Sequence, residues 1–138
     1  MNITEYIESV IGKPWVDRAT GPDAFDCWGL VVDSFNKIEG VELPTVLGYS
    51  DGIKTSKCAK HEIERSHWIE VDKPTAGLVF VCEHSGGASH VGRMIDGLWC
   101  LHSPHGGSGV QVNKLAAMKR LNRNQTYRYF KYAPNSIS

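Results

Sequence analysis

The sequence lacks several features that would place a chain in a broad class at once. It has no net charge, since 15 basic residues balance 15 acidic ones, and it has no basic run. That balance argues against nucleic acid or an anionic membrane surface as the main partner. The longest apolar runs are only a few residues long, too short to cross a bilayer. The start "MNITEYIESVIGKPW" has two glutamates and no basic segment before an apolar stretch, so we expect no secretory signal.

The sequence has few cysteines, and their spacing matches no paired motif. The chain has four cysteines with no CxxC pair and no framework spacing, namely Cys27, Cys58, Cys82 and Cys100. We therefore expect free thiols in a chain made in a reducing cytosol. No internal repeat, low-complexity tract or linker is present, and 138 residues suit one compact domain spanning residues 1–138.

Helical patterns come first and strand patterns follow. Apolar spacing predicts a helix over residues 3–11 with Asn2 or Thr4 as its cap, and a second over residues 27–38 between Asp26 and Gly40. A third helix is expected over residues 56–68. From Thr75 onward, short β-rich runs alternate with turn residues, at 76–84, 88–95, 98–104, 108–115 and 126–133. This order predicts an α+β domain with a mainly antiparallel sheet.

A thiol stands where the second helix should begin, in "GPDAFDCWGLVVDSF". Backbone N–H groups and the positive end of the helix dipole favour thiolate at such a position, and thiolate is the nucleophile. The same N–H groups can donate to a developing oxyanion. The alternative interpretation of Cys27 is a small buried residue that packs the first helical turn.

A nucleophilic cysteine needs a base, and His90 and His102 each sit within a short β-rich run, whereas His84 and His105 border Gly-rich turns. The segment "HVGRMIDGLWCLH" predicts a hairpin with Asp96 and Gly97 at its tip. A three-residue loop with Gly97 in the left-handed conformation pairs His90 directly with His102 and puts both imidazoles on one face. In that arrangement His90 holds the thiolate as an ion pair and His102 orients His90. The alternative is two strand histidines without chemistry.

These residues resemble a known family. The ordered segments "FDCWGLV", "GLVFV", "SHVGRMI" and "LHSPHGGSGV" are similar to those of the NlpC family of papain-like cysteine endopeptidases, over about residues 12–112. The resemblance implies Cys27 as nucleophile, His90 as general base and His102 as the third residue. It also implies N-terminal helices packed on a five- or six-stranded antiparallel sheet, and cleavage of cell-wall peptides between D-γ-glutamyl and a diamino acid.

Other positions near these motifs are expected to line the site. They are Trp15, Asp26, Trp28 and His105. Trp15 stands where the family often has tyrosine, and an indole N–H donates but cannot accept a hydrogen bond. Arg93 stands where an apolar residue is usual in the family. The basic residues of "KLAAMKRLNRNQ" suggest a solvated face rather than a partner site.

The form "GPDAFDCWGLV" resembles tail-assembly members of the family from long-tailed bacteriophages. This implies a tail-tip protein made in the host cytoplasm, carried in the virion and brought to peptidoglycan during injection, with other tail-tip proteins as partners. A silent structural tail component is an alternative, and so is acyl transfer or deamidation on the same scaffold.

A zinc site is the remaining alternative. Its candidate ligands lie in Cys82-Glu83-His84 and in the segment from Cys100 to His105. Their spacing matches no usual zinc motif, so we expect neither a metal nor a cofactor.

Overall fold

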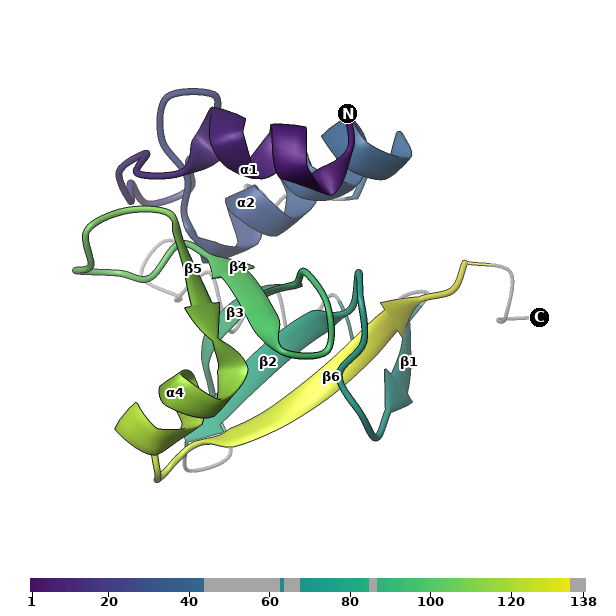
Figure 1. The fold of residues 1–138 in the computed structure, drawn as a ribbon, viewed down its shortest axis with the longest axis vertical. Coiled ribbons are helices and arrows are strands. Elements are labelled where there is room, and N and C mark those ends of the chain that lie inside the picture. The colour runs from purple at the N-terminus through teal and green to yellow at the C-terminus, as the bar shows by residue number, and fades with distance from the viewer. Residues whose placement is uncertain (44–62, 64–67, 85–86, 135–138) are drawn as a thin grey trace.

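Two helices lie together beside a twisted sheet (Figure 1). The computed structural model describes residues 1–43, 63, 68–84 and 87–134. Helix α1 (Ile3–Val10) is followed by α2 (Cys27–Ser34), which continues into a π-helical turn, η1 (Phe35–Glu39). Six strands form one antiparallel sheet in the order β1-β6-β2-β3-β4-β5. The predicted α+β architecture with a six-stranded antiparallel sheet is confirmed.

The strands and the last helix follow one another in the C-terminal half of the chain. Their bounds are β1 (Trp68–Val71), β2 (Val79–His84), β3 (Gly87–Met94), β4 (Trp99–His102), β5 (Gln111–Lys114), α4 (Leu115–Leu121) and β6 (Thr126–Tyr132). Strand β1 was not predicted. The helix expected over residues 56–68 lies mostly outside the described residues, and its last residue opens β1 instead. None of the described helices has the length and apolar character needed to span a membrane.

The first two helices begin where the sequence predicts. In α1, the Asn2 side chain accepts from the Glu5 N–H while the Glu5 side chain accepts from the Asn2 N–H, which is a capping box. In α2, the Asp26 carboxylate accepts from the Gly29 N–H at 2.6 Å. The helical run ends after η1 at Gly40, whose φ of 71° is left-handed and suits glycine.

The two faces of the sheet bury different side chains. Odd-numbered positions of β2 and β3, such as Val79 and Val91, pack against α2 and η1. Even-numbered positions, such as Phe80 and Met94, pack on the opposite face with Leu115 and Met118 of α4. The core therefore fills the space on both sides of the sheet, and α4 covers the face opposite α2.

Arg93 is an exception to the apolar pattern on the α2 face. It is buried, with its guanidinium 3.7 Å from the centroid of the Phe35 ring. It donates to the Ser34 hydroxyl and the Gly77 carbonyl oxygen, and it forms an ion pair with Glu39. The unusual arginine therefore fastens the end of α2 and η1 to the sheet.

Candidate active site

The thiol of Cys27 lies at the first position of α2. Its side chain is only 4% exposed, although it reaches the cavity described below. The backbone N–H groups of Val91, Trp28 and Cys27 itself face the sulfur and favour thiolate. The Ser103 hydroxyl, next to His102, donates to the carbonyl oxygen of Phe25 at 2.8 Å. That buried bond ties the end of β4, which carries His102, to the segment just before Cys27.

Two of the predicted lining residues do not line the cavity. Asp26 is 1% exposed and caps α2, where its carboxylate also accepts from the Arg18 N–H. Trp28 is 1% exposed and packs in the core, with its ring 6.5 Å from that of Trp68. Their positions at the helix start account for this, because Asp26 is the extended N-cap of α2 and Trp28 projects about 100° around the helix from Cys27. Asp26 thus caps α2, and Trp28 anchors the same helix in the core.

The β3–β4 hairpin has a different register from the predicted one. Met94 pairs with Cys100 and Arg93 with Leu101, so the predicted pairing of His90 with His102 is wrong by two residues. Gly97 is not left-handed. Instead, the Asp96 carboxylate accepts from the N–H groups of Leu98 and Trp99 and closes the turn.

The two imidazoles nevertheless share a face, because a shift of two residues preserves strand alternation. Gly92 lies beside the pair, and a Cβ there would come within 2.5 Å of the Phe80 ring and 2.9 Å of the Cβ of His102. Glycine at this position therefore leaves the space in which His102 approaches His90 diagonally across the hairpin.

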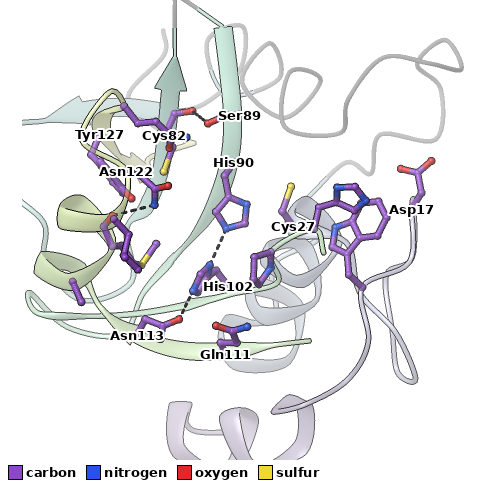
Figure 2. Close-up of a pocket in the computed structure, with 17 residues that line it drawn as sticks. Asp17, Cys27, Cys82, Ser89, His90, His102, Gln111, Asn113, Asn122 and Tyr127 are labelled. Atoms are coloured by element: carbon purple, nitrogen blue, oxygen red, sulfur yellow. Dashed lines mark hydrogen bonds between the residues drawn. The ribbon is translucent and has the colours of Figure 1, made fainter. Parts of the chain in front are cut away.

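A hydrogen-bonded chain runs from His90 through His102 to Asn113 (Figure 2). The His90 Nε2–His102 Nδ1 distance is 2.9 Å, and the His102 Nε2–Asn113 Oδ1 distance is 2.7 Å. A carbonyl oxygen only accepts, so His102 donates from Nε2 and its Nδ1 is left to accept from His90 Nε2–H. The proton order then leaves His90 Nδ1 with a lone pair, as a base requires.

Asn113 was missed at the sequence level. Gln111 pairs with His102 across β4 and β5, so Asn113 lies on the same face two residues farther along. The signal existed in the alternation of "QVNK", but it becomes visible only once the pairing of β4 with β5 is known.

Burial dominates the electrostatics of the pair. Desolvation, with a smaller contribution from neighbouring His102, lowers the pKa of His90 to about 3. Desolvation also lowers the pKa of His102, although its bond to Asn113 opposes the shift. Both imidazoles are thus neutral near pH 7, in agreement with the proton order of the chain.

The thiol is also neutral. Desolvation and then the Asp26 carboxylate raise the pKa of Cys27 to about 12, against the smaller effect of the nearby N–H groups. Within the described residues, no hydrogen bond joins the sulfur to His90. Burial of both groups thus opposes the predicted thiolate–imidazolium ion pair and outweighs the helix dipole.

A cavity of about 540 Å³ joins these groups. One end is lined by Trp15, Asp17 and His105, with the Trp15 and His105 rings 4.3 Å apart. The other end runs under α4, past Cys82 and Tyr127. Trp15 and His105 thus line the cavity, whereas the wall formed by α4 was not predicted.

Metal binding finds no support in the described part of the chain. There, no three His, Cys, Asp or Glu side chains are grouped so as to hold an ion. His102 is engaged with His90 and Asn113, and the Cys100 thiol contacts the sulfur of Met94.

Comparison with known proteins places this geometry in a family. The model of the NlpC/P60 family matches residues 12–128. The chain belongs to the NlpC/P60 family. It is 31% identical over 121 residues to "Probable endopeptidase YafL" of Escherichia coli (strain K12), covering 83% of this chain and 45% of YafL. The chain thus spans less than half the length of that curated relative.

Solved structures of the family share the fold. The NlpC/p60 domain of peptidoglycan hydrolase SagA has a TM-score of 0.61 at 20% identity, covering 91% of this chain and 92% of that one. NlpC2 from Trichomonas vaginalis has a TM-score of 0.60 at 18% identity, covering 83% of this chain and 40% of that one. The predicted papain-like NlpC fold is therefore confirmed.

Proposed function

We propose that this NlpC/P60 protein is a cysteine endopeptidase that hydrolyses amide bonds in peptidoglycan stem peptides, between D-γ-glutamyl and a diamino acid. The observation that carries the proposal is the ordered chain His90–His102–Asn113 in one cavity with a thiol at a helix start. A relative described as a probable endopeptidase and a neighbour described as a peptidoglycan hydrolase support the substrate class.

The chemistry proceeds in two halves. His90 Nδ1 takes the thiol proton as the sulfur of Cys27 attacks the carbonyl carbon, and the resulting oxyanion lies near the N–H groups at the start of α2. His90 then gives that proton to the leaving amine, the C–N bond breaks, and a thioester remains on Cys27. In the second half His90 takes a proton from water, the hydroxide attacks the thioester, and the thiolate leaves and recovers its proton.

His102 and Asn113 act through His90 without touching substrate. The Asn113 carbonyl fixes the proton of His102 on Nε2, and the lone pair of His102 fixes the proton of His90 on Nε2. As His90 becomes imidazolium, its Nε2–H bond to His102 strengthens. Neutral orienters stabilise the imidazolium less than a carboxylate does, which suits a base that is neutral at rest.

Incubation with purified stem peptides followed by mass analysis tests the proposal. The wild type is expected to split the peptide into two fragments, and Cys27→Ala to leave it intact. Cys100→Ala, which removes another buried thiol away from the cavity, is the matched control and should retain cleavage. Loss of ammonia without chain cleavage would instead indicate deamidation, and a fragment joined to an added amine would indicate acyl transfer.

The proposed setting is a bacteriophage tail tip, on the basis of the sequence form around Cys27. In that setting the protein is carried in the virion with other tail-tip proteins and opens the wall during injection. Particles carrying Cys27→Ala should assemble but infect poorly. Normal infection by such particles would favour the alternative, a silent structural component.

A further inference from the structure

The balanced net charge hides an uneven distribution along the chain. Residues 1–96 contain all 15 acidic residues and 9 basic ones, whereas residues 97–138 contain 6 basic residues and no acidic one. Three of these cations, Lys119, Arg120 and Arg123, belong to α4 and the turn that follows it. The α4 end of the molecule is therefore positively charged, although the whole chain is neutral.

Two of the three cations are neighbours in sequence of residues that line the active-site cavity beside α4. Residues of α4 and its following turn that line the cavity are Ala117, Met118, Leu121, Asn122 and Gln125. Arg120 precedes Leu121, and Arg123 lies between Asn122 and Gln125. Both arginines are exposed, and neither has an ion pair with a described residue. Lys119 differs, because its ammonium lies over the rings of Tyr127 and Tyr129.

The cavity is also polarised from end to end. Asp17 is the one acidic side chain among its described lining residues, and it lies beyond Cys27 on the side away from α4 (Figure 2). The α4 end offers uncharged groups from Cys82, Ser89 and Tyr127. Leu121 adds an apolar surface there, since it is 85% exposed at the cavity edge. An anionic group at the α4 end therefore meets no fixed anion among the described lining residues, and Arg120 and Arg123 adjoin that lining in the chain.

The order of the catalytic groups determines which half of a peptide reaches that end. The attacked carbon must lie at the Cys27 sulfur and the leaving nitrogen at His90, which gives it a proton. His90 stands between Cys27 and the α4 wall (Figure 2), so the chain on the leaving-amine side continues toward α4.

We propose that Arg120 and Arg123 bind carboxylates of the substrate on the leaving-amine side of the cleaved bond. This inference rests on the proposed endopeptidase function and adds a preference to it. A diamino acid with free carboxylates is favoured over the same residue with carboxamides. Since both arginines are exposed, the preference is screened by salt.

The test compares one stem peptide whose diamino acid carries free carboxylates with the same peptide carrying carboxamides. For Arg120→Gln/Arg123→Gln, kcat/KM on the carboxylate peptide should fall about fivefold and kcat/KM on the carboxamide peptide should stay unchanged. The matched control is Lys73→Gln/Lys131→Gln, which removes two exposed charges near β1 and the end of β6 and should change neither value.

A binding measurement tests this inference separately from the endopeptidase function. The two peptides are titrated onto Cys27→Ala, with and without the arginine substitutions. The difference in affinity between them measures the carboxylate preference in the absence of turnover. If the wild type cleaves neither peptide, the proposed function fails, and the binding preference alone decides the role of the arginines. Equal handling of both peptides by the wild type, an unchanged preference in the arginine variant, or no binding of either peptide would each overturn the inference.

Discussion

Removal of the Asn113 amide tests whether the order of protons along the histidine chain matters. In Asn113→Ala, His102 Nε2–H loses the acceptor that lies 2.7 Å away. The His102 tautomer with its proton on Nδ1 then becomes competitive, and that tautomer points an N–H at the N–H of His90. The active proton order is lost in a fraction of the molecules, and KM is expected to change little because Asn113 acts through His90.

The magnitude follows from the lost bond. An unsatisfied buried donor costs about 1–3 kcal/mol, and each 1.4 kcal/mol is about tenfold in rate. The expected fall in kcat is therefore about 5- to 150-fold. Asn36→Ala, which removes an exposed amide from η1, is the matched control and should retain wild-type kcat. Nitrogen-15 NMR of the histidine rings reads the tautomer of His102 independently of activity.

Asn113→Asp gives the sharper result because it predicts a change in pH dependence. A carboxylate next to His102 raises the pKa of that imidazole. Protonated His102 donates from Nδ1 to His90 Nε2, which forces the proton of His90 onto Nδ1, the nitrogen that must take the thiol proton. Activity of the variant should thus fall as pH drops through the raised pKa. A variant with the wild-type pH profile, or Asn113→Ala with full kcat and an unchanged tautomer, would refute the proton order.

Three further predictions follow from burial and close packing at the site. The rate at which iodoacetamide alkylates Cys27, measured by peptide mapping, should rise about tenfold per pH unit between about pH 6 and 9. The reason is that the pKa of the Cys27 thiol is raised to about 12, so the thiolate fraction grows tenfold with each unit. A rate independent of pH would indicate a thiolate–imidazolium ion pair instead. The contribution of His90 to the free energy of unfolding should be constant above pH ~6.5 and fall by up to about 1.4 kcal/mol per pH unit toward pH ~3, because the lowered pKa of His90 lets the unfolded state bind the proton first. Denaturant titrations of His90→Gln should therefore show a shallower slope than the wild type over this range, and an equal slope would contradict the assignment. Gly92→Ala should abolish cleavage, since its Cβ would meet the Phe80 ring at 2.5 Å. Gly97→Ala should stay active, because its Cβ would meet only the Pro74 oxygen, at 3.3 Å. The reverse order of effects would support the predicted turn with Gly97 in the left-handed conformation.

Features governed by neighbouring residues could be predicted from the sequence. The cap of α1 depends on Asn2 and Glu5, three residues apart, and the cap of α2 depends on Asp26 and the first helical turn. In both cases the side chain and the N–H group that it accepts from lie within one turn. The position of Cys27 at a helix start followed from the same local rule.

Features that depend on pairing between segments were predicted less well. Two hairpin loops of different length put His90 and His102 on the same face, so alternation gave the shared face but not the register. The choice depended on the Asp96 side chain closing the turn and on the space at Gly92, neither of which a turn motif reveals. Prediction of Asn113 required the register between β4 and β5, and the sequence does not determine the path of the Gly-rich loop that joins these strands.

The charge state of the thiol depended on burial, which a sequence motif does not measure. A helix dipole is worth about 0.3–1 kcal/mol and at most about 2, which is up to about 1.5 pKa units. Desolvation of a fully buried group reaches about 3–5 units, and Cys27 is 4% exposed. With the pKa of the thiol near 12 and that of His90 near 3, a resting ion pair is strongly disfavoured. In the proposed endopeptidase, proton transfer to His90 would then accompany the formation of the carbon–sulfur bond, so that the neutral pair acts by general-base attack rather than from a stored thiolate.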